Sequence, residues 1–163
     1  MVSENRTMAR FMFDTNVFGK ILWIQVPHSL LTDRHEYFVT HIQNDELNAA
    51  PQRVKNRLLT VFQVIPQQRI PTETAIWGIS RFDMAKLGDG KLYNLILSEL
   101  GNKKPLEAEN NIKDALIGET AINNEIILVT DDKALIDSVE RHGGRVMSFN
   151  TFQKALTTES SSG

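Results

Sequence analysis

The four aliphatic residues Ile126, Ile127, Leu128 and Val129 place the strongest limit on the fold of this chain. An uninterrupted run of this kind is typical of a strand that is buried on both faces of a parallel sheet, because helices then cover both faces. A second segment, residues 10–13, is largely apolar and precedes apolar residues at helical spacing, which indicates a strand followed by a helix. The sequence therefore predicts an α/β fold around a central parallel sheet.

The rest of the chain alternates between strand and helix patterns. Strands are predicted at residues 37–42 and 145–147, and helices at residues 43–50, 51–62, 92–100, 112–122 and 134–141. Residues 64–90 lose clear periodicity because proline and glycine punctuate them. The alternation shows no internal repeat, which favours one sheet flanked by helices.

The length of 163 residues fits a single domain. We expect an N-terminal tail at residues 1–9, one domain at residues 10–156 and a disordered serine-rich tail at residues 157–163. The chain has no cysteine, which excludes disulfides, thiolate zinc sites and cysteine nucleophiles. No apolar run approaches the roughly 20 residues that span a bilayer, so we expect a cytoplasmic protein without a membrane partner.

Acidic residues directly follow two of the predicted strands. Asp14 comes after residues 10–13, and Asp131 and Asp132 come just after the aliphatic run. Ligands of open α/β sheets bind beyond the carboxyl ends of strands, where the strand order reverses, so these acids can converge. Carboxylates are natural ligands of hard divalent cations. Aspartate also favours helix N-caps, and each junction alone is equally compatible with a capping role.

Four short motifs follow the order and the strand–helix placement of PIN domains, over roughly residues 10–150. Residues 11–18, Phe-Met-Phe-Asp-Thr-Asn-Val-Phe, resemble the opening strand and Asp-x-Asn of that family, and Asn-Asp-Glu-Leu at 44–47 resembles the second acid. Residues 114–122 resemble the helix that carries the third acid, and Leu-Val-Thr-Asp-Asp at 128–132 resembles the closing Thr-x-Asp. The chain thus resembles PIN-domain ribonucleases, whose best-known members are toxins of bacterial and archaeal toxin–antitoxin pairs.

This resemblance implies a single-domain, three-layer α/β/α fold and an endoribonuclease that hydrolyses RNA phosphodiester bonds with Mg²⁺ or Mn²⁺. The acids that it implies as both catalytic and metal-binding are Asp14, Glu46, Asp114 and Asp132. Asn16 and Thr130 are implied as polar supports, and Asp131 is a second choice at the usually variable position. Taken alone, Glu46 and Asp114 also fit solvated helix faces, so the joint pattern carries the prediction. RNA, an antitoxin protein and a second copy of the chain are the implied partners.

Residues that bind substrate are harder to identify. The net charge of −2 gives no general attraction to nucleic acid, so contact with RNA requires a local patch. Single strands bind to basic grooves with aromatic platforms, which makes candidates of Arg53, Arg57, Trp77, Arg81 and Lys86. The same residue types also occur on solvated helix faces, in cores and at interfaces.

Two further expectations concern selectivity and assembly. Residues 64–90 lengthen the chain between the second and third acids, and irregular loops on a rigid scaffold commonly select the substrate. A homodimer is expected to form through the apolar stripe of Leu92, Leu95 and Ile96, together with Trp77.

Three other interpretations were weighed. A phosphatase of the haloacid-dehalogenase type also begins with an aspartate after its first strand, but it requires a second aspartate two residues later, where Asn16 stands. A receiver-like signalling domain requires a late lysine in an arrangement that this sequence does not show. The main alternative is a non-catalytic PIN-like module that binds RNA or a protein, and the presence of all four acids disfavours it.

Overall fold

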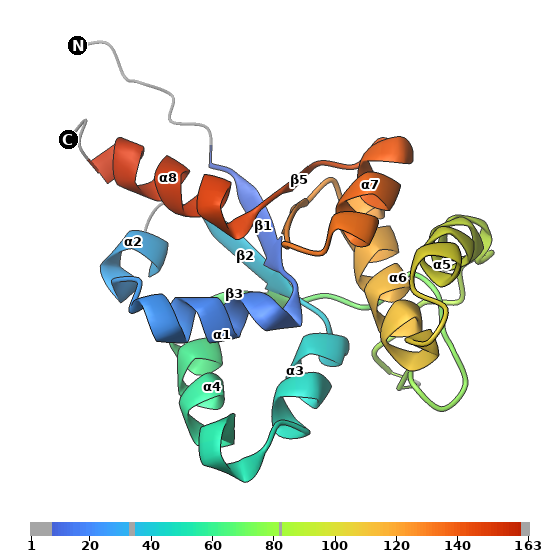
Figure 1. Ribbon diagram of the computed structural model, residues 1–163, viewed down its shortest axis with the longest axis horizontal. Coiled ribbons are helices and arrows are strands. Elements are labelled where there is room, and N and C mark those ends of the chain that lie inside the picture. Colours follow the sequence, from blue (N-terminus) through green and yellow to red (C-terminus); the bar gives the residue numbers. More distant parts are fainter. Residues whose placement is uncertain (1–7, 33–34, 82, 161–163) are drawn as a thin grey trace.

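The computed structural model describes residues 8–32, 35–81 and 83–160 (Figure 1). In this part of the chain five parallel strands form one sheet in the order β3-β2-β1-β4-β5. The strands are β1 Arg10–Phe13, β2 Glu36–Val39, β3 Gln67–Arg69, β4 Ile127–Val129 and β5 Val146–Met147. The helices are α1 Thr15–Ile24, α2 His28–Thr32, α3 His41–Asn48, α4 Gln52–Val64, α5 Lys91–Lys103, α6 Ala108–Asn123, α7 Lys133–Arg141 and α8 Phe149–Ser160.

Two hydrophobic clusters cover the two faces of the sheet, and side-chain alternation along β1 separates them. Phe11 and Phe13 pack with residues of α1, α4 and α8 on one face. Met12, between them, packs with residues of α5, α6 and α7 on the other. Figure 1 shows these two helical groups on opposite sides of the strands. The three-layer α/β/α, PIN-like fold predicted from the sequence is therefore confirmed.

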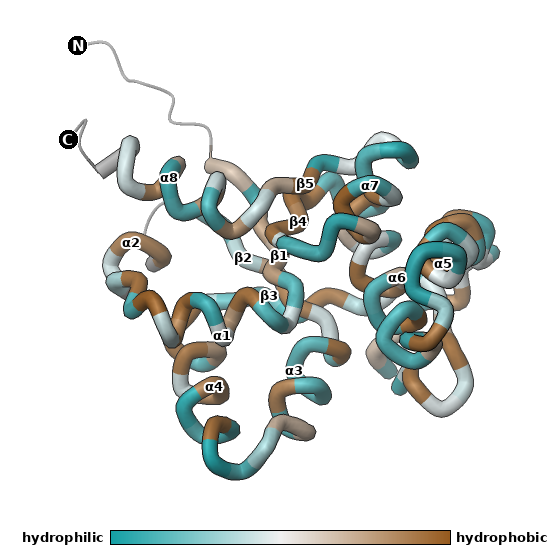
Figure 2. Tube along the Cα trace, in the orientation of Figure 1, coloured by the Kyte–Doolittle hydropathy of each residue, from teal (hydrophilic) through white to brown (hydrophobic). Residues whose placement is uncertain are grey.

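The hydropathy of the chain follows this layering. In Figure 2 hydrophobic residues recur along the strands and in stripes along the helices, and polar residues occupy the remaining helical faces. None of the helices in the described ranges is long and apolar enough to cross a membrane.

The strand predicted at residues 37–42 ends early because a helix begins inside it. Thr40 is the N-cap of α3, and its hydroxyl accepts a hydrogen bond from the amide of Ile42. The side chain of Gln43 accepts from the amide of Thr40, which completes a capping box. The β-branched and aromatic composition hid this boundary from the sequence pattern.

The C-terminal tail was predicted to be disordered from residue 157, and this prediction is wrong for residues 157–160, which continue α8. Phe149, Phe152 and Leu156 form a buried stripe that holds this helix on the sheet. The Thr158 hydroxyl donates to the Lys154 carbonyl, which satisfies part of the last turn internally. Residues 161–163, and residues 1–7 of the predicted N-terminal tail, lie outside the described part of the chain.

The poorly periodic stretch at 64–90 contains the edge strand β3 and a long ordered connection. The sequence of β3, Gln-Gln-Arg, is polar because the strand lies at the edge of the sheet, and no apolar alternation marked it. Beyond it, Ile70, Ile76 and Ile79 pack against the core cluster of α5, α6 and α7. The connection is thus anchored to the core between residues 70 and 79.

The strand order places two strand ends next to each other. The chain leaves β1 through β2 and β3 on one side, and it returns through β4 and β5 on the other, so the order reverses between β1 and β4. Phe13 is paired with Val129, and the amide of Asp14 donates to the Val129 carbonyl at 3.0 Å. The residues that follow both strands therefore start from the same point at the carboxyl edge of the sheet.

Candidate active site

A pocket of about 350 Å³ opens at this carboxyl edge. All four acids predicted from the sequence line it, although they come from four separate parts of the chain. The polar and charged residues around it are Asp14, Thr15, Asn16, Glu46, Glu107, Asn110, Asp114 and Asp132. The structure therefore brings together Asp14, Glu46, Asp114 and Asp132, and it places the predicted support Asn16 at the same pocket.

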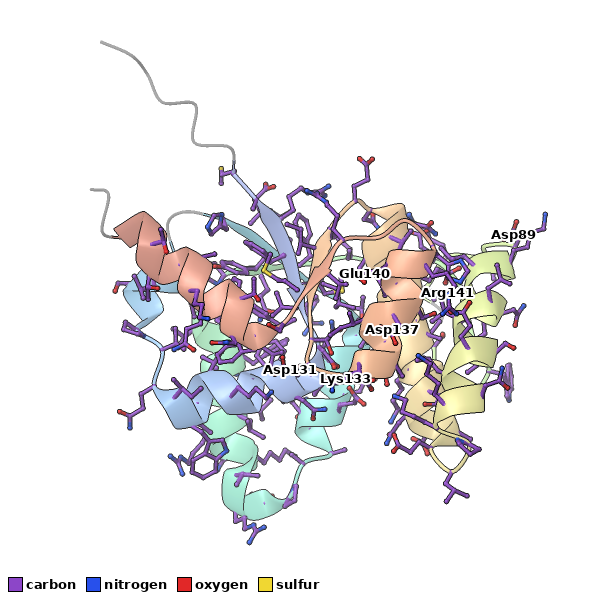
Figure 3. The ribbon with its side chains drawn as sticks, turned by 45° about the horizontal axis from the view of Figure 1, so that its top comes forward. Asp89, Asp131, Lys133, Asp137, Glu140 and Arg141 are labelled. Atoms are coloured by element: carbon purple, nitrogen blue, oxygen red, sulfur yellow. The ribbon has the colours of Figure 1, made fainter. Side chains whose placement is uncertain are left out.

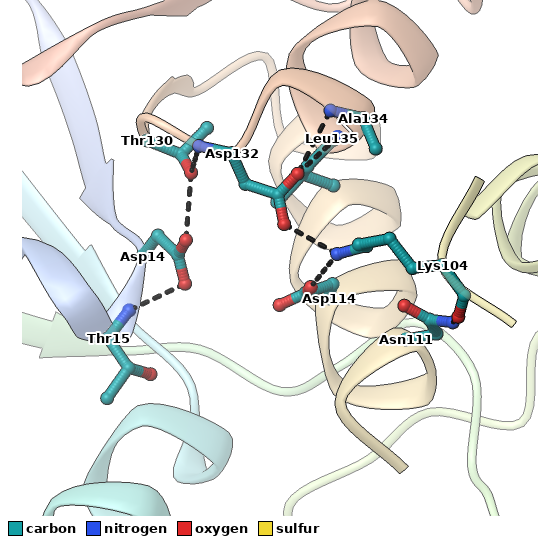
Figure 4. Close-up of polar contacts among 9 residues, drawn as sticks. All are labelled: Asp14, Thr15, Lys104, Asn111, Asp114, Thr130, Asp132, Ala134 and Leu135. Carbon is teal, nitrogen blue, oxygen red and sulfur yellow. Dashed lines mark hydrogen bonds and ion pairs between the residues drawn. The ribbon is translucent and has the colours of Figure 1, made fainter. Parts of the chain in front are cut away.

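Asp14 is buried, and each of its two carboxylate oxygens accepts a hydrogen bond (Figure 4). One oxygen accepts from the amide of Thr15 at 2.7 Å, as an N-cap of α1. The other accepts from the hydroxyl of Thr130 at 2.8 Å. Thr130 is fully buried, and its oxygen also accepts from the amide of Asp132 at 3.1 Å. Thr130 thus joins the two strand ends through hydrogen bonds to Asp14 and Asp132.

Asp132 is both a helix cap and a pocket residue. Its Oδ1 accepts from the amides of Ala134 and Leu135 at the start of α7, at 2.9 and 3.2 Å. Its Oδ2 accepts from the ammonium of Lys104 at 2.5 Å. Asp132 therefore caps α7 through Oδ1, as the capping interpretation expected, whereas Oδ2 contacts Lys104.

Asp131, the second choice among the supports, is not among the residues that line the pocket. Its Oδ1 accepts from the amide of Phe149 at the start of α8, and its Oδ2 is paired with Lys20 of α1. Figure 3 shows Asp131 beside α1 where α7 begins. Adjacent residues on a short connection point in different directions, so Asp131 holds α8 and α1 whereas Asp132 faces the pocket.

Glu46 and Asp114 reach the pocket from helices on opposite faces of the sheet. Glu46 lies on α3, and its Oε2 accepts from the hydroxyl of Thr15. Asp114 lies on α6, and its Oδ2 accepts from Lys104 Nζ at 3.1 Å (Figure 4). Neither acid occupies the purely solvated helix face that each would fit in isolation.

The clustering raises the pKa of several of these acids. Burial raises the pKa of Asp14, and the charges of Glu46 and Asp132 raise it further, whereas the Thr130 hydrogen bond opposes them. Burial likewise raises the pKa of Glu46, and the nearby charge of Asp114 adds to the rise. The pKa of Asp114 rises to about 7, first through burial and then through Asp14, although Lys104 opposes the shift. The pocket thus concentrates negative charge that a cation would relieve.

The donor set suits a hard divalent cation, because it consists of carboxylate oxygens with an amide at the rim. In the described ranges, however, no three acidic or histidine side chains are arranged to hold one ion as they stand. Lys104 Nζ bridges Asp114 and Asp132, so one oxygen of each carboxylate is already paired with the ammonium. Mg²⁺ takes only one or two carboxylates directly and keeps several waters, so the residues fit such an ion without a closed cage.

Two of the basic residues predicted to bind RNA lie on α4. Arg53 and Arg57 are exposed there. The guanidinium of Arg57 lies over the ring of Trp23, 5.3 Å from its centroid. Arg57 also lines an apolar groove between α1 and α4, away from the acids.

The other predicted RNA-binding residues lie on the connection between β3 and α5. Arg81 is paired with Asp45 at 2.5 Å and Lys86 with Glu73 at 3.0 Å, so both cations already have acidic partners. Trp77 is 100% exposed, which leaves its ring free for stacking. Arg81 contacts Asp45, the residue before Glu46, so this ion pair joins the connection to the helix that carries Glu46.

The prediction that an apolar stripe forms a dimer interface is wrong for Ile96. Ile96 is fully buried in the core with α6 and α7, because α5 packs this face inward. Leu92 is partly buried against the same cluster, whereas Leu95 is 53% exposed. Only Leu95 and Trp77 remain as exposed apolar residues of the predicted surface.

The sequence reasoning missed two residues that contact the acids. Thr15 supplies both an amide to Asp14 and a hydroxyl to Glu46, and its position next to Asp14 was the available signal. Lys104 follows α5, where a basic residue at a helix end is unremarkable. Only the tertiary arrangement shows that its side chain lies between Asp114 and Asp132.

Comparison with solved structures agrees with this class of fold. The resemblance to the PIN-domain fold that the motifs indicated is confirmed by solved structures that share this fold. One is DNA-bound VapBC from Salmonella typhimurium, with a TM-score of 0.53 and 20% identity, covering 86% of this chain and 98% of that chain. Another is VapBC2 from Rickettsia felis bound to a promoter DNA fragment, with a TM-score of 0.50 and 16% identity, covering 85% and 97%. No protein-family profile and no curated protein matches the sequence.

Proposed function

We propose that this protein is a Mg²⁺- or Mn²⁺-dependent endoribonuclease. The observation that carries the proposal is the convergence of four acids, distant in sequence, on one pocket at the point where the strand order reverses. Structural carboxylates are normally spread out or paired with bases, because close like charges destabilise the fold. A group of acids that raise one another's pKa is better explained by a cation that binds there.

The residues of the chain would orient the carboxylates and define where RNA lies. Thr130 and the Thr15 amide hold Asp14, while the amides at the start of α7 hold Asp132. Glu46 and Asp114 would complete the metal-binding group from the two flanking layers. A bound Mg²⁺ or Mn²⁺ would acidify an attacking water and neutralise charge that develops on the phosphate. Asn16, exposed at the rim of the pocket, would hydrogen-bond to the substrate or to metal-bound water.

We further propose that the ribonuclease is the toxin of a toxin–antitoxin pair. Both neighbours described above are VapBC complexes, and each aligns over nearly its whole chain, which supports this proposal. The corresponding partner would be an antitoxin protein. A homodimer remains part of the proposal, with Leu95 and Trp77 as the exposed apolar residues near its expected interface.

The direct test is incubation of the purified chain with a mixed pool of RNAs in MnCl₂ or MgCl₂, with EDTA as the metal-free control. We expect cleavage only with the divalent ion. Asp132→Asn should abolish cleavage, since it removes one carboxylate charge from the pocket. The matched control is Asp131→Asn, which changes the neighbouring acid outside the pocket and should retain activity, because the asparagine side-chain oxygen can still accept from the Phe149 amide.

Asp14→Asn provides an independent variant from the other strand end. We expect it to abolish cleavage while the circular dichroism spectrum stays that of the folded chain. If RNA is bound but never cleaved with any divalent ion, the non-catalytic RNA-binding module would replace the nuclease. Cleavage that survives both Asp14→Asn and Asp132→Asn would also contradict the proposal.

A further inference from the structure

We infer that Lys104 is an internal counter-cation of this pocket, which holds Asp114 and Asp132 in the metal-free protein and must give way when a divalent ion binds. This inference rests on the proposed function, because it assigns a role in metal binding to a residue of the same site. Lys104 Nζ lies 2.5 Å from Asp132 Oδ2 and 3.1 Å from Asp114 Oδ2 (Figure 4). It therefore bridges two of the four acids, one from α6 and one from the end of β4.

The backbone of Lys104 is held firmly, so the bridge follows from the fold. Its amide donates to the Leu100 carbonyl at 2.7 Å, as the cap that ends α5. Its carbonyl accepts from the side chain of buried Asn111 at 2.7 Å and from the amide of Glu107 at 3.2 Å. These contacts tie the end of α5 to the first turns of α6, where Asp114 lies.

The hydrogen bonds of the Lys104 side chain in the described residues, in contrast, are made by its tip, to carboxylate oxygens for which a cation would compete. Four methylene groups connect the ammonium to the fixed backbone, and 16% of the side chain is exposed, which gives it a route out of the pocket. A divalent ion near Asp114 and Asp132 would repel the ammonium and would attract the same oxygens more strongly. The ammonium and the ion therefore oppose each other in binding.

Two consequences follow for the protein without RNA. The ammonium offsets part of the carboxylate repulsion and therefore stabilises the metal-free fold. The same charge lowers the affinity for the ion, because binding must first break the bridge. Removal of the Lys104 charge should therefore strengthen metal binding and weaken the metal-free fold.

The neighbouring residue provides a matched control. Lys103 forms a similar ion pair with Asp137 at 2.7 Å, but both side chains are about half exposed and lie on the outer surface of α5 and α7. Lys104→Gln and Lys103→Gln thus remove the same charge one residue apart, but only Lys104 contacts acids that line the pocket. Lys104→Arg keeps the positive charge and should behave like the parent chain.

The test is titration of each purified, EDTA-dialysed chain with MnCl₂ by isothermal calorimetry, together with the melting temperature in EDTA. We expect Lys104→Gln to bind Mn²⁺ at least about tenfold more tightly than the parent, since it removes a unit charge at contact distance. Its melting temperature in EDTA should be lower. Lys103→Gln and Lys104→Arg should bind as the parent does.

A second measurement uses the parent chain, so its result does not depend on whether a variant folds. Acetylation of lysines by an amine-reactive reagent, followed by mass spectrometry, should label Lys104 faster in MnCl₂ than in EDTA, while Lys103 stays unchanged. Equal labelling of Lys104 in both conditions, or weaker or unchanged Mn²⁺ binding by Lys104→Gln, would overturn the inference while the metal site stands. If neither the parent nor Lys104→Gln binds Mn²⁺, both the inference and the proposed metal dependence fail.

Discussion

Asp114→Asn should stabilise the metal-free protein at neutral and alkaline pH while it removes metal-dependent activity. The pKa of Asp114 is raised from 3.8 to about 7, mainly by burial. For an acid with a raised pKa, the folded state holds the proton more tightly than the unfolded state does, so the protonated group favours folding. The free energy of unfolding therefore falls as the pH rises from about 4 to about 7, and the loss persists above pH 7.

The size of this loss follows from the two pKa values. At about 1.4 kcal/mol for each pH unit between 3.8 and 7, an ionised Asp114 costs up to about 4 kcal/mol above pH 7. Asparagine cannot ionise, so the variant avoids this cost. The contact with Lys104 is already included in the value, because Lys104 opposes the rise in the pKa of Asp114. We expect Asp114→Asn to gain roughly 2–4 kcal/mol at pH 8 and almost nothing at pH 4.

The assay is urea denaturation of both chains in EDTA across pH 4 to 8. Asp137→Asn is the control, because Asp137 is an exposed acid whose pKa is lowered by its pair with Lys103. It should show no gain in stability at pH 8. The reasoning is refuted if Asp114→Asn is no more stable than the parent at pH 8, or if the two stability profiles run parallel across the pH range.

Three further predictions concern residues around the pocket. Thr130→Val should lower the free energy of unfolding by about 1–3 kcal/mol in urea denaturation, because buried Asp14 loses a hydrogen-bond donor; an unchanged midpoint would contradict this. Asp131→Ala should cost about 0.5–1.5 kcal/mol through the lost hydrogen bond to the Phe149 amide and should leave RNA cleavage intact, whereas a loss of cleavage would place Asp131 in the site. Trp77→Ala should weaken binding of fluorescent single-stranded RNA in EDTA without a change in melting temperature, since the ring is fully exposed; equal affinity would exclude stacking on it.

Sequence reasoning reached the sheet and the acids because both follow from local patterns. An aliphatic run predicts a buried parallel strand, and the carboxyl ends of such strands meet at one edge, so acids directly after β1 and β4 were predictable as neighbours. Glu46 and Asp114 required more, because nothing local distinguishes a helical acid that faces a pocket from one that faces solvent. The resemblance of the motifs to PIN domains supplied that step.

The failures have equally specific causes. β3 is an edge strand of three polar residues, so it lacks the apolar signal on which strand prediction depends. Ile96 belongs to an apolar stripe, and a stripe alone does not say whether a partner subunit or the domain's own α6 covers it. The tail at 157–160 is helical because Phe152 and Leu156 anchor the turns before it. In each case the outcome depends on tertiary neighbours that no window of sequence contains.

Lys104 differs from the other donors to the four acids. The other donors to the four acids in the described part of the chain are backbone amides and threonine hydroxyls, which are short and fixed by the strand ends and helix starts that carry them. The fold itself thus orients Asp14, Glu46 and Asp132, whereas Asp114 accepts its hydrogen bond from Lys104. The ammonium of Lys104 lies at the end of a long, flexible side chain. It donates to Asp114 Oδ2 and to Asp132 Oδ2, the Asp132 oxygen that does not cap α7. A cation that enters the pocket would therefore displace this contact first, while the hydrogen bonds that orient Asp14, Glu46 and Asp132 stay in place.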